Sequence, residues 1–141
     1  MKPSLALRVA SVLTLLFAGA HSLGGLSFWS PAGETAALRA MRSFHFDALG
    51  VSRTYLDFYL GFGFIISIYL LTQAVVLWQL ASFAKTAANC VRPLIGTFFL
   101  TSLVSAFLAW RYIFLIPVVS FLAIAVCLGL AFYATGKNAD T

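Results

Sequence analysis

The chain has 141 residues and a net charge of +5, and 62% of its residues are hydrophobic while only 9% are charged. A soluble domain of this composition could not cover its surface with polar groups, so the composition indicates a membrane protein. The positive charges stand singly between apolar segments, which excludes a basic stripe able to follow a nucleic-acid backbone. We therefore expect lipid headgroups, and no nucleic acid, as the anions that this chain meets.

Four stretches contain no Asp, Glu, Lys or Arg: Val9 to Gly33, Phe58 to Ala84, Pro93 to Trp110 and Tyr112 to Gly136. About 20 apolar residues cross the roughly 30 Å hydrocarbon core as a helix, so each stretch suffices or nearly suffices for one crossing. Backbone in lipid must satisfy its own hydrogen bonds, which favours helices. The sequence predicts one all-α domain over residues 1–141, an antiparallel bundle of four transmembrane helices at about 6–27, 57–83, 91–110 and 113–134.

The amino-terminal segment has two interpretations. Lys2 and Arg8 precede an apolar run that ends at the small residues 18–20, a pattern typical of a cleaved signal peptide. The apolar character nevertheless continues from Leu23 to Trp29, which favours an uncleaved first transmembrane helix.

Orientation follows from the Lys and Arg residues near the ends of the helices. Four crossings place Lys2, Arg8, Lys85, Arg92 and Lys137 on the side of the termini, and Arg39, Arg42, Arg53 and Arg111 on the other. This small excess predicts that both termini are cytoplasmic.

The first loop carries the signals of a short amphipathic helix. Leu38, Met41 and Phe44 recur every three residues, whereas Arg39 and Arg42 fall on other faces. Such a helix lies in the membrane interface with its arginines among the headgroups. We expect this interfacial helix at about 31–49, between the first and second transmembrane helices.

Local capping signals set the limits of the loop. Ser30 and Pro31 have the form of an N-cap followed by proline at the first helical position. Gly50 is suited to stop the helix or to form a following turn. Thr54 and Asp57 are spaced as a capping box, which predicts reciprocal hydrogen bonds at the start of the second transmembrane helix.

The residues able to do chemistry all fall at the loop face. His21, His45 and Asp57 could serve as general acid and base, and His21, His45 and Glu34 could hold a divalent metal. The alternatives are structural. His21 would bond a neighbouring helix or interfacial water, Asp57 would cap its helix and pair with Arg53, Glu34 would favour the helix start, and His45 would sit among headgroups.

A second set of polar residues could bind a ligand. Its candidates are Tyr69 and Gln73, one turn apart on the second transmembrane helix, and Arg53 and Arg111 at the loop face. The alternative for Tyr69 and Gln73 is interhelical hydrogen bonding with hydroxyls of the third apolar stretch, namely Thr97, Thr101, Ser102 and Ser105.

Small residues four apart predict where helices approach one another closely. They are the pair Ala18 and Ser22, the pair Gly63 and Ser67, and the series Ala123, Cys127 and Ala131. We expect helix contacts at these positions.

Two motifs carry a resemblance to a known group. The first stretch contains His21-Ser22-Leu23-Gly24-Gly25, and the second opens with Asp57-Phe58-Tyr59-Leu60-Gly61-Phe62-Gly63-Phe64. With four spans over the whole length, the chain resembles the small uncharacterised four-helix integral membrane proteins of bacteria, DoxX-like in size and layout. The resemblance implies a multi-pass protein of the bacterial inner membrane, and it assigns no catalytic residue.

The functional expectation is a non-catalytic module. The 14 phenylalanines, the small-residue seams and the few polar groups favour an accessory subunit of a membrane complex or a binder of a lipid, quinone or pigment. The expected partners are membrane lipid and other membrane subunits, or further copies of this chain. The alternative is a small membrane enzyme that acts on an apolar substrate at the outer face. A channel or transporter comes third, because the four stretches contain no carboxylate, lysine or arginine.

Overall fold

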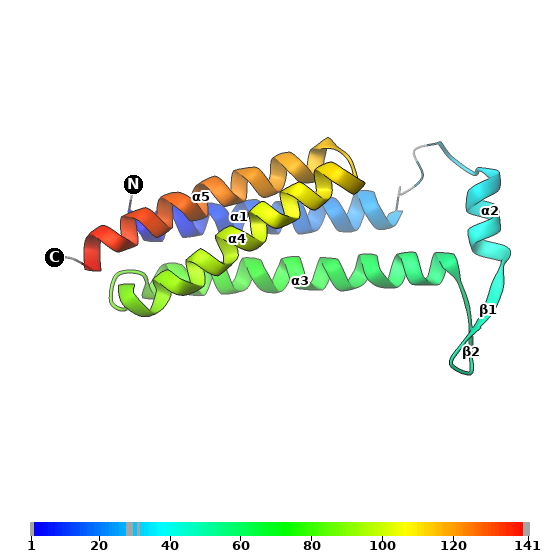
Figure 1. Ribbon diagram of the computed structural model, residues 1–141, viewed down its shortest axis with the longest axis horizontal. Coiled ribbons are helices and arrows are strands. Elements are labelled where there is room, and N and C mark those ends of the chain that lie inside the picture. The colour runs from blue at the N-terminus through cyan, green and yellow to red at the C-terminus, as the bar shows by residue number, and fades with distance from the viewer. Residues whose placement is uncertain (1, 28–29, 31, 140–141) are drawn as a thin grey trace. The chain divides into compact units, whose positions relative to one another are not determined.

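The computed structural model describes residues 2–27, 30 and 32–139, and it is predominantly helical (Figure 1). Four of the described helices are long and apolar enough to cross a membrane. In chain order the elements are α1 (Pro3–Ala20), the π-helix η1 (His21–Ser27), α2 (Ala36–Ser43), β1 (His45–Ala48), β2 (Val51–Thr54), α3 (Tyr55–Phe83), α4 (Ala88–Tyr112) and α5 (Leu115–Ala139).

The long helices occupy the predicted stretches with shifted ends. The stretch predicted as one helix at 6–27 begins at Pro3, and its α-helical part stops at Ala20 before η1 continues it. The wider π-helical turns begin at His21, where two consecutive polar side chains face a neighbouring helix. The helix predicted at 113–134 continues to Ala139.

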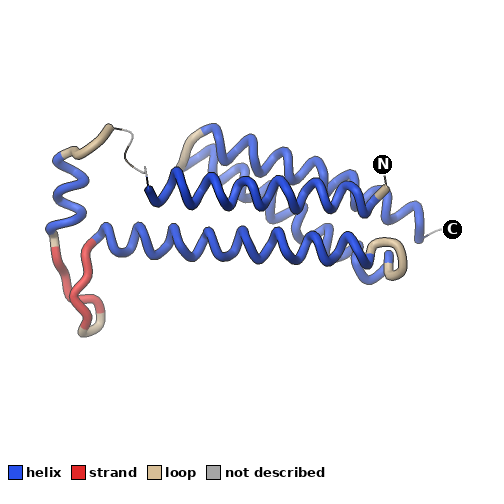
Figure 2. The backbone as a smooth tube through the Cα atoms, turned by 180° about the vertical axis from the view of Figure 1, so that it is seen from behind, coloured by secondary structure: helices blue, strands red, loops and turns tan. Residues whose placement is uncertain are grey.

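The prediction of one helix over 31–49 is wrong in its extent. Only Ala36–Ser43 is helical, and Thr35 is its N-cap, with Oγ1 accepting the Leu38 N–H at 3.2 Å. The predicted cap at Ser30 depends on Pro31, which lies outside the described residues. Phe44 ends the helix with extended backbone, and the chain then forms a β-hairpin (Figure 2).

The hairpin forms because its turn and its side-chain alternation suit strands. Phe46 and Ala48 are half-buried, whereas His45 and Asp47 between them are exposed. Leu49 and Gly50 adopt φ values of 55° and 84°, which form the tight turn between β1 and β2. The expectation of a turn at Gly50 is thereby confirmed.

The chain divides into two compact units, Met1–Phe17 with Leu70–Thr141, and Ala18–Tyr69. We call them the core unit and the hairpin unit. In the core unit, residues near the starts of α1 and α4 share a buried cluster with residues of α3 and α5. The cluster contains Ala6, Leu7, Ala10, Leu77, Leu80, Ala81, Ala84, Val91, Ile95, Ile124, Leu128 and Ala131.

Glycines set the register between α4 and α5, which lie side by side in Figures 1 and 2. A Cβ added at each would meet the facing helix: 3.2 Å from the Phe132 ring at Gly96, 3.3 Å from the Phe99 ring at Gly129, and 3.1 Å from the Arg92 guanidinium at Gly136. Each step forward along α4 is matched by an equal step back along α5. The two helices therefore run in opposite directions with large residues packed over glycines.

Most buried hydroxyls bond within their own helix. Ser11 is an exception, since its Oγ donates to the carbonyl oxygen of Ala74 at 2.6 Å and joins α1 to α3 within the core unit. Interhelical bonding was predicted for Thr97, Thr101 and Ser102, but each donates to the carbonyl four residues earlier. That prediction is wrong for these three, because the preceding turn offers an acceptor that needs no neighbouring helix.

Candidate functional site

A polar seam joins η1 to α3 inside the hairpin unit. His21 Nε2 lies 3.2 Å from the carbonyl oxygen of Gly63, and Ser22 Oγ lies 2.9 Å from Ser67 Oγ. Because a carbonyl oxygen can only accept, this contact requires the proton of His21 on Nε2. Ser22 also reaches the Ala18 carbonyl at 2.8 Å. The two predicted small-residue pairs are thus confirmed as a helix contact, and His21 bonds a neighbouring helix as its structural interpretation predicted.

Asp57 forms the predicted capping box with Thr54. Its Oδ2 accepts the Thr54 N–H at 2.8 Å and the Thr54 hydroxyl at 2.9 Å, while the Asp57 N–H donates to Thr54 Oγ1 at 3.2 Å. Arg53, predicted as its ion-pair partner, instead donates from Nη1 to the Ser52 carbonyl oxygen at 3.0 Å. The carboxylate therefore holds the junction between β2 and α3.

His45 and Asp47 stabilise the hairpin through their nearest backbone. His45 Nδ1 lies 2.9 Å from the Ser43 carbonyl oxygen, and Asp47 Oδ1 accepts the Gly50 N–H at 2.7 Å across the turn. The strand register places His45 opposite Thr54, the residue that binds Asp57. The hairpin therefore brings two of the three predicted acid–base candidates to the same junction.

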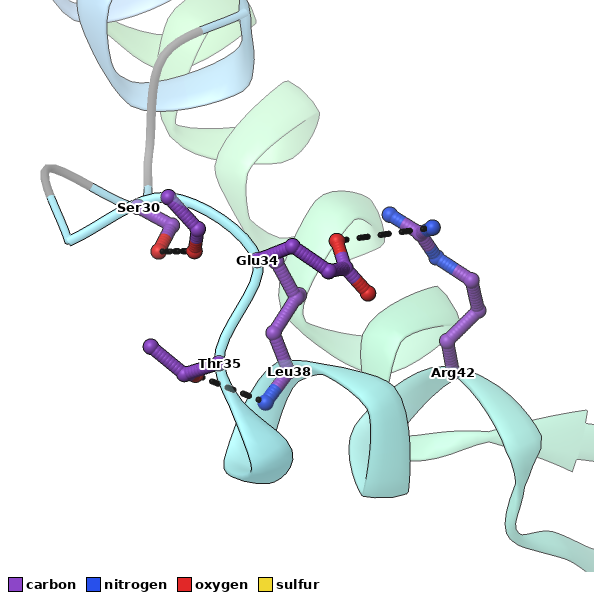
Figure 3. Close-up of polar contacts among 6 residues, drawn as sticks. Ser30, Glu34, Thr35, Leu38 and Arg42 are labelled. Carbon is purple, nitrogen blue, oxygen red and sulfur yellow. Dashed lines mark hydrogen bonds and ion pairs between the residues drawn. The ribbon is translucent and has the colours of Figure 1, made fainter.

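Glu34 is tied to α2, as Figure 3 shows. Its Oε2 lies 3.8 Å from Arg42 Nη1, and both side chains are exposed. The adjacent N-cap bond from Leu38 to Thr35 and the bond from Ser30 Oγ to the Gly33 carbonyl at 2.6 Å order the same turn. A negative charge just before a helix start also interacts favourably with the helix dipole, as its structural interpretation predicted.

Metal coordination has no assembled site within residues 2–27, 30 and 32–139. No three His, Cys, Asp or Glu side chains there lie close enough together to hold one ion. His21, His45 and Glu34 therefore do not form the metal set considered from the sequence.

The predicted ligand-binding residues fall in both units. Tyr69 is 71% exposed and belongs to the hairpin unit, whereas Gln73 is half-buried and belongs to the core unit. The Arg111 guanidinium lies 5.1 Å from the ring centre of its neighbour Tyr112 at the end of α4. A shallow depression of about 220 Å³ along α1, lined by Arg8, Val9, Val12 and Leu13, includes none of these residues.

An aromatic ladder continues from the hairpin into α3, and the sequence analysis missed it. Successive ring centres are 5.9 Å apart for Phe44 and Tyr55, 4.9 Å for Tyr55 and Phe46, 5.7 Å for Phe46 and Phe58, and 6.3 Å for Phe58 and Phe62. All but Phe46 are exposed by more than two-fifths, from 42% at Phe58 to 61% at Phe62. The sequence signals for the ladder were the two-residue spacing of Phe44 and Phe46, typical of one face of a strand, and the four-residue spacing of Phe58 and Phe62, typical of one face of a helix.

No family model, curated protein or solved structure matches this chain. The resemblance to DoxX-like proteins therefore stays a prediction. The function has to be inferred from the polar seam, the capped junction and the aromatic ladder themselves.

Proposed function

We propose that the protein is a non-catalytic, multi-pass subunit of a membrane complex, which docks on another membrane protein through its aromatic ladder. The observation that carries this proposal is the ladder itself, a continuous series of rings, all but Phe46 exposed, that begins at Phe44 just before the hairpin and continues along an apolar helix. Aromatic residues are enriched at the centres of protein interfaces.

A protein partner suits the ladder better than lipid tails do. Phe44 and Phe46 precede the candidate span Tyr55–Phe83, while Phe58 and Phe62 lie within it. Acyl chains could cover only the rings within the span, Phe58 and Phe62, because the hydrocarbon core ends at the headgroups. A partner that is itself embedded in the membrane could cover both parts of the ladder.

The polar candidates support a non-catalytic role. His21, Asp57, His45 and Glu34 all hold local structure through the contacts described above. The alternative, a small membrane enzyme, would require His45 and Asp57 to act from the junction they stabilise. A channel or transporter has less support, since no described Asp, Glu, Lys, Arg or His side chain is buried.

The proposal includes four helices that cross a bacterial inner membrane as an antiparallel bundle with cytoplasmic termini. Four helices of sufficient length and hydropathy support the crossings. The shared cluster near the starts of α1 and α4 and the ends of α3 and α5 supports the alternating directions. The small excess of Lys and Arg on the side of the termini supports the orientation.

Site-specific photo-crosslinking in native membranes tests the docking. A photoreactive phenylalanine analogue at Phe62, which is 61% exposed, should give a discrete protein adduct. The same analogue at Val104 on α4, which is 58% exposed, is the matched control and should react with lipid alone. Phe58→Ala should weaken the Phe62 adduct. Lipid adducts alone at both positions would contradict the subunit proposal and favour a lipid binder.

A further inference from the structure

Positive charge gathers at one end of the core unit. The residues concerned are Lys2, Arg8, Lys85, Arg92 and Lys137, all of them exposed, and we call them the basic end. They lie at the start of α1, after α3, near the start of α4 and at the end of α5, and these helix ends share one buried cluster. The described residues of the core unit contain no Asp or Glu. The positive charge there is therefore not balanced within the described part of the unit.

Three of these cations lie against aromatic rings. Arg8 Cζ is 5.2 Å from the centre of the Trp78 ring, Arg92 Cζ is 4.5 Å from that of Phe132, and Lys137 Nζ is 5.1 Å from that of Tyr133. A cation over a ring face is attracted by the ring quadrupole. These contacts hold the charges near the ends of the apolar helices, and in the proposed membrane insertion such ends lie where headgroups meet the acyl chains.

Arg92 is the most firmly placed of the five. Its guanidinium lies against the Phe132 ring and also beside Gly136, where an added Cβ would approach it to 3.1–3.3 Å. Gly96 in turn leaves room for Phe132, with the ring only 3.2 Å from where its Cβ would be. The Arg92 guanidinium makes no hydrogen bond or ion pair with the described residues. A planar group that lies against a ring and has available N–H donors is suited to bind a phosphate through two parallel bonds.

We propose that the basic end is a binding site for an acidic glycerophospholipid, whose headgroup phosphate is held by Arg92 and attracted by the surrounding cations. The occupant follows from charge complementarity, because the acidic lipid supplies the negative charge that the described unit lacks. Basic sites between transmembrane helices bind anionic headgroups in this way. The inference rests on the proposed membrane insertion but is independent of the proposed partner subunit.

Native mass spectrometry of the full chain in mild detergent tests the site, with phosphatidylglycerol or phosphatidylcholine added at equal concentration. The wild type should retain phosphatidylglycerol preferentially. Arg92→Gln should reduce its affinity about fivefold, as expected for loss of one cation near a headgroup. Arg111→Gln is the matched control, since Arg111 also lies against a ring but at the other end of α4, and it should leave the affinity unchanged.

Gly136→Ala tests whether lipid binding depends on the position of the Arg92 guanidinium or on its charge alone. The added methyl group would displace the guanidinium while the net charge stays the same, so the phosphatidylglycerol affinity should still fall. Excess inorganic phosphate should not displace the bound phosphatidylglycerol. If the site instead bound free phosphate, excess inorganic phosphate would displace the lipid. Equal retention of the two lipids, or equal losses in Arg92→Gln and Arg111→Gln, would overturn the proposal.

Two further measurements complete the test. Asp140 lies outside the described residues and is the one Asp or Glu in the sequence after Asp57. If Asp140→Asn raised the phosphatidylglycerol affinity and abolished the difference between wild type and Arg92→Gln, an internal ion pair would replace the proposed site. Arg92→Gln should still sediment with membranes after an alkaline wash. Release of this variant from the membranes would contradict the proposed membrane insertion as well as the lipid site.

Discussion

The hydroxyl oxygens of Ser22 and Ser67 lie 2.9 Å apart and join the π-helix η1 to α3. Both residues belong to small-residue pairs, with Ala18 and Gly63 one turn earlier, so the helices can approach closely enough for two short side chains to meet. Polar contacts of this kind fix which faces of two apolar helices meet, because apolar packing alone would permit several rotations.

A double-mutant cycle should detect this contact. We expect Ser22→Ala and Ser67→Ala to be coupled by about 0.5–1 kcal/mol, because each single change already removes the shared hydrogen bond. Unfolding by titration with a denaturing detergent, followed by circular dichroism, measures the free energies. Ser22→Ala with Ser120→Ala is the control pair, since Ser120 bonds to Ile116 in its own helix, and no coupling is expected. Strictly additive effects for Ser22 and Ser67 would contradict the contact.

The capping box should depend on the Thr54 hydroxyl. Thr54→Val keeps the shape of the side chain but removes both hydrogen bonds of Oγ1, so the free energy of unfolding should fall by about 1 kcal/mol. Thr54→Ser retains the hydroxyl and should preserve most of the stability. The same detergent titration gives both values. Equal stability of the two variants would show that the box does not hold the start of α3.

The long helices and the capping box were predictable because their signals are local. Charge-free runs define the apolar helices, and the Thr54–Asp57 spacing lies within one helical turn. The hairpin was missed for a physical reason. Leu49 adopts a positive φ that leucine rarely takes, so the turn carries no Asn-Gly signal in the sequence. The three-residue period through Phe44 then favoured a longer helix.

The candidate site was predictable only in part. The sequence placed His21 against a neighbouring helix and Asp57 at a cap, since both roles follow from position along one segment. The contact of Arg92 with Gly136 was not predictable, because it depends on the register between α4 and α5. The aromatic ladder was missed because it joins rings of a strand to rings of a helix.

The hairpin turn should respond oppositely to two neighbouring changes. Gly50→Ala places a Cβ on a residue with φ of 84°, so the hairpin should lose about 1 kcal/mol. Leu49→Asn introduces a residue that tolerates its φ of 55°, and it replaces a fully exposed leucine, so the hairpin should become more stable. Amide hydrogen exchange of Phe46 and Val51 measures both effects. Slower exchange in Gly50→Ala than in the wild type would contradict the turn geometry.

The buried hydroxyls of Ser11 and Ser102 should contribute differently to the free energy of unfolding. Ser11→Ala removes a bond between two helices, so the free energy of unfolding should fall by about 0.5–1.5 kcal/mol. Ser102→Ala is the matched control, because Ser102 is also buried but bonds to the Phe98 carbonyl in its own helix, and a smaller loss is expected. A greater loss in Ser102→Ala would reverse the order that the hydrogen bonds predict.

Gly129 should tolerate no large side chain in the α4–α5 contact. A Cβ there would lie 3.3 Å from the Phe99 ring, so the larger side chain of Gly129→Val should force the helices apart and cost about 1–3 kcal/mol. Gly61→Ala is the control, since nothing lies within 4 Å of its added Cβ and alanine favours the helix, so stability should stay equal or rise. Phe99→Ala combined with Gly129→Val should recover part of the loss, because removal of the ring makes room for valine. Detergent titration distinguishes these outcomes, and an unchanged stability of Gly129→Val would contradict the register in which large residues of one helix pack over glycines of the other.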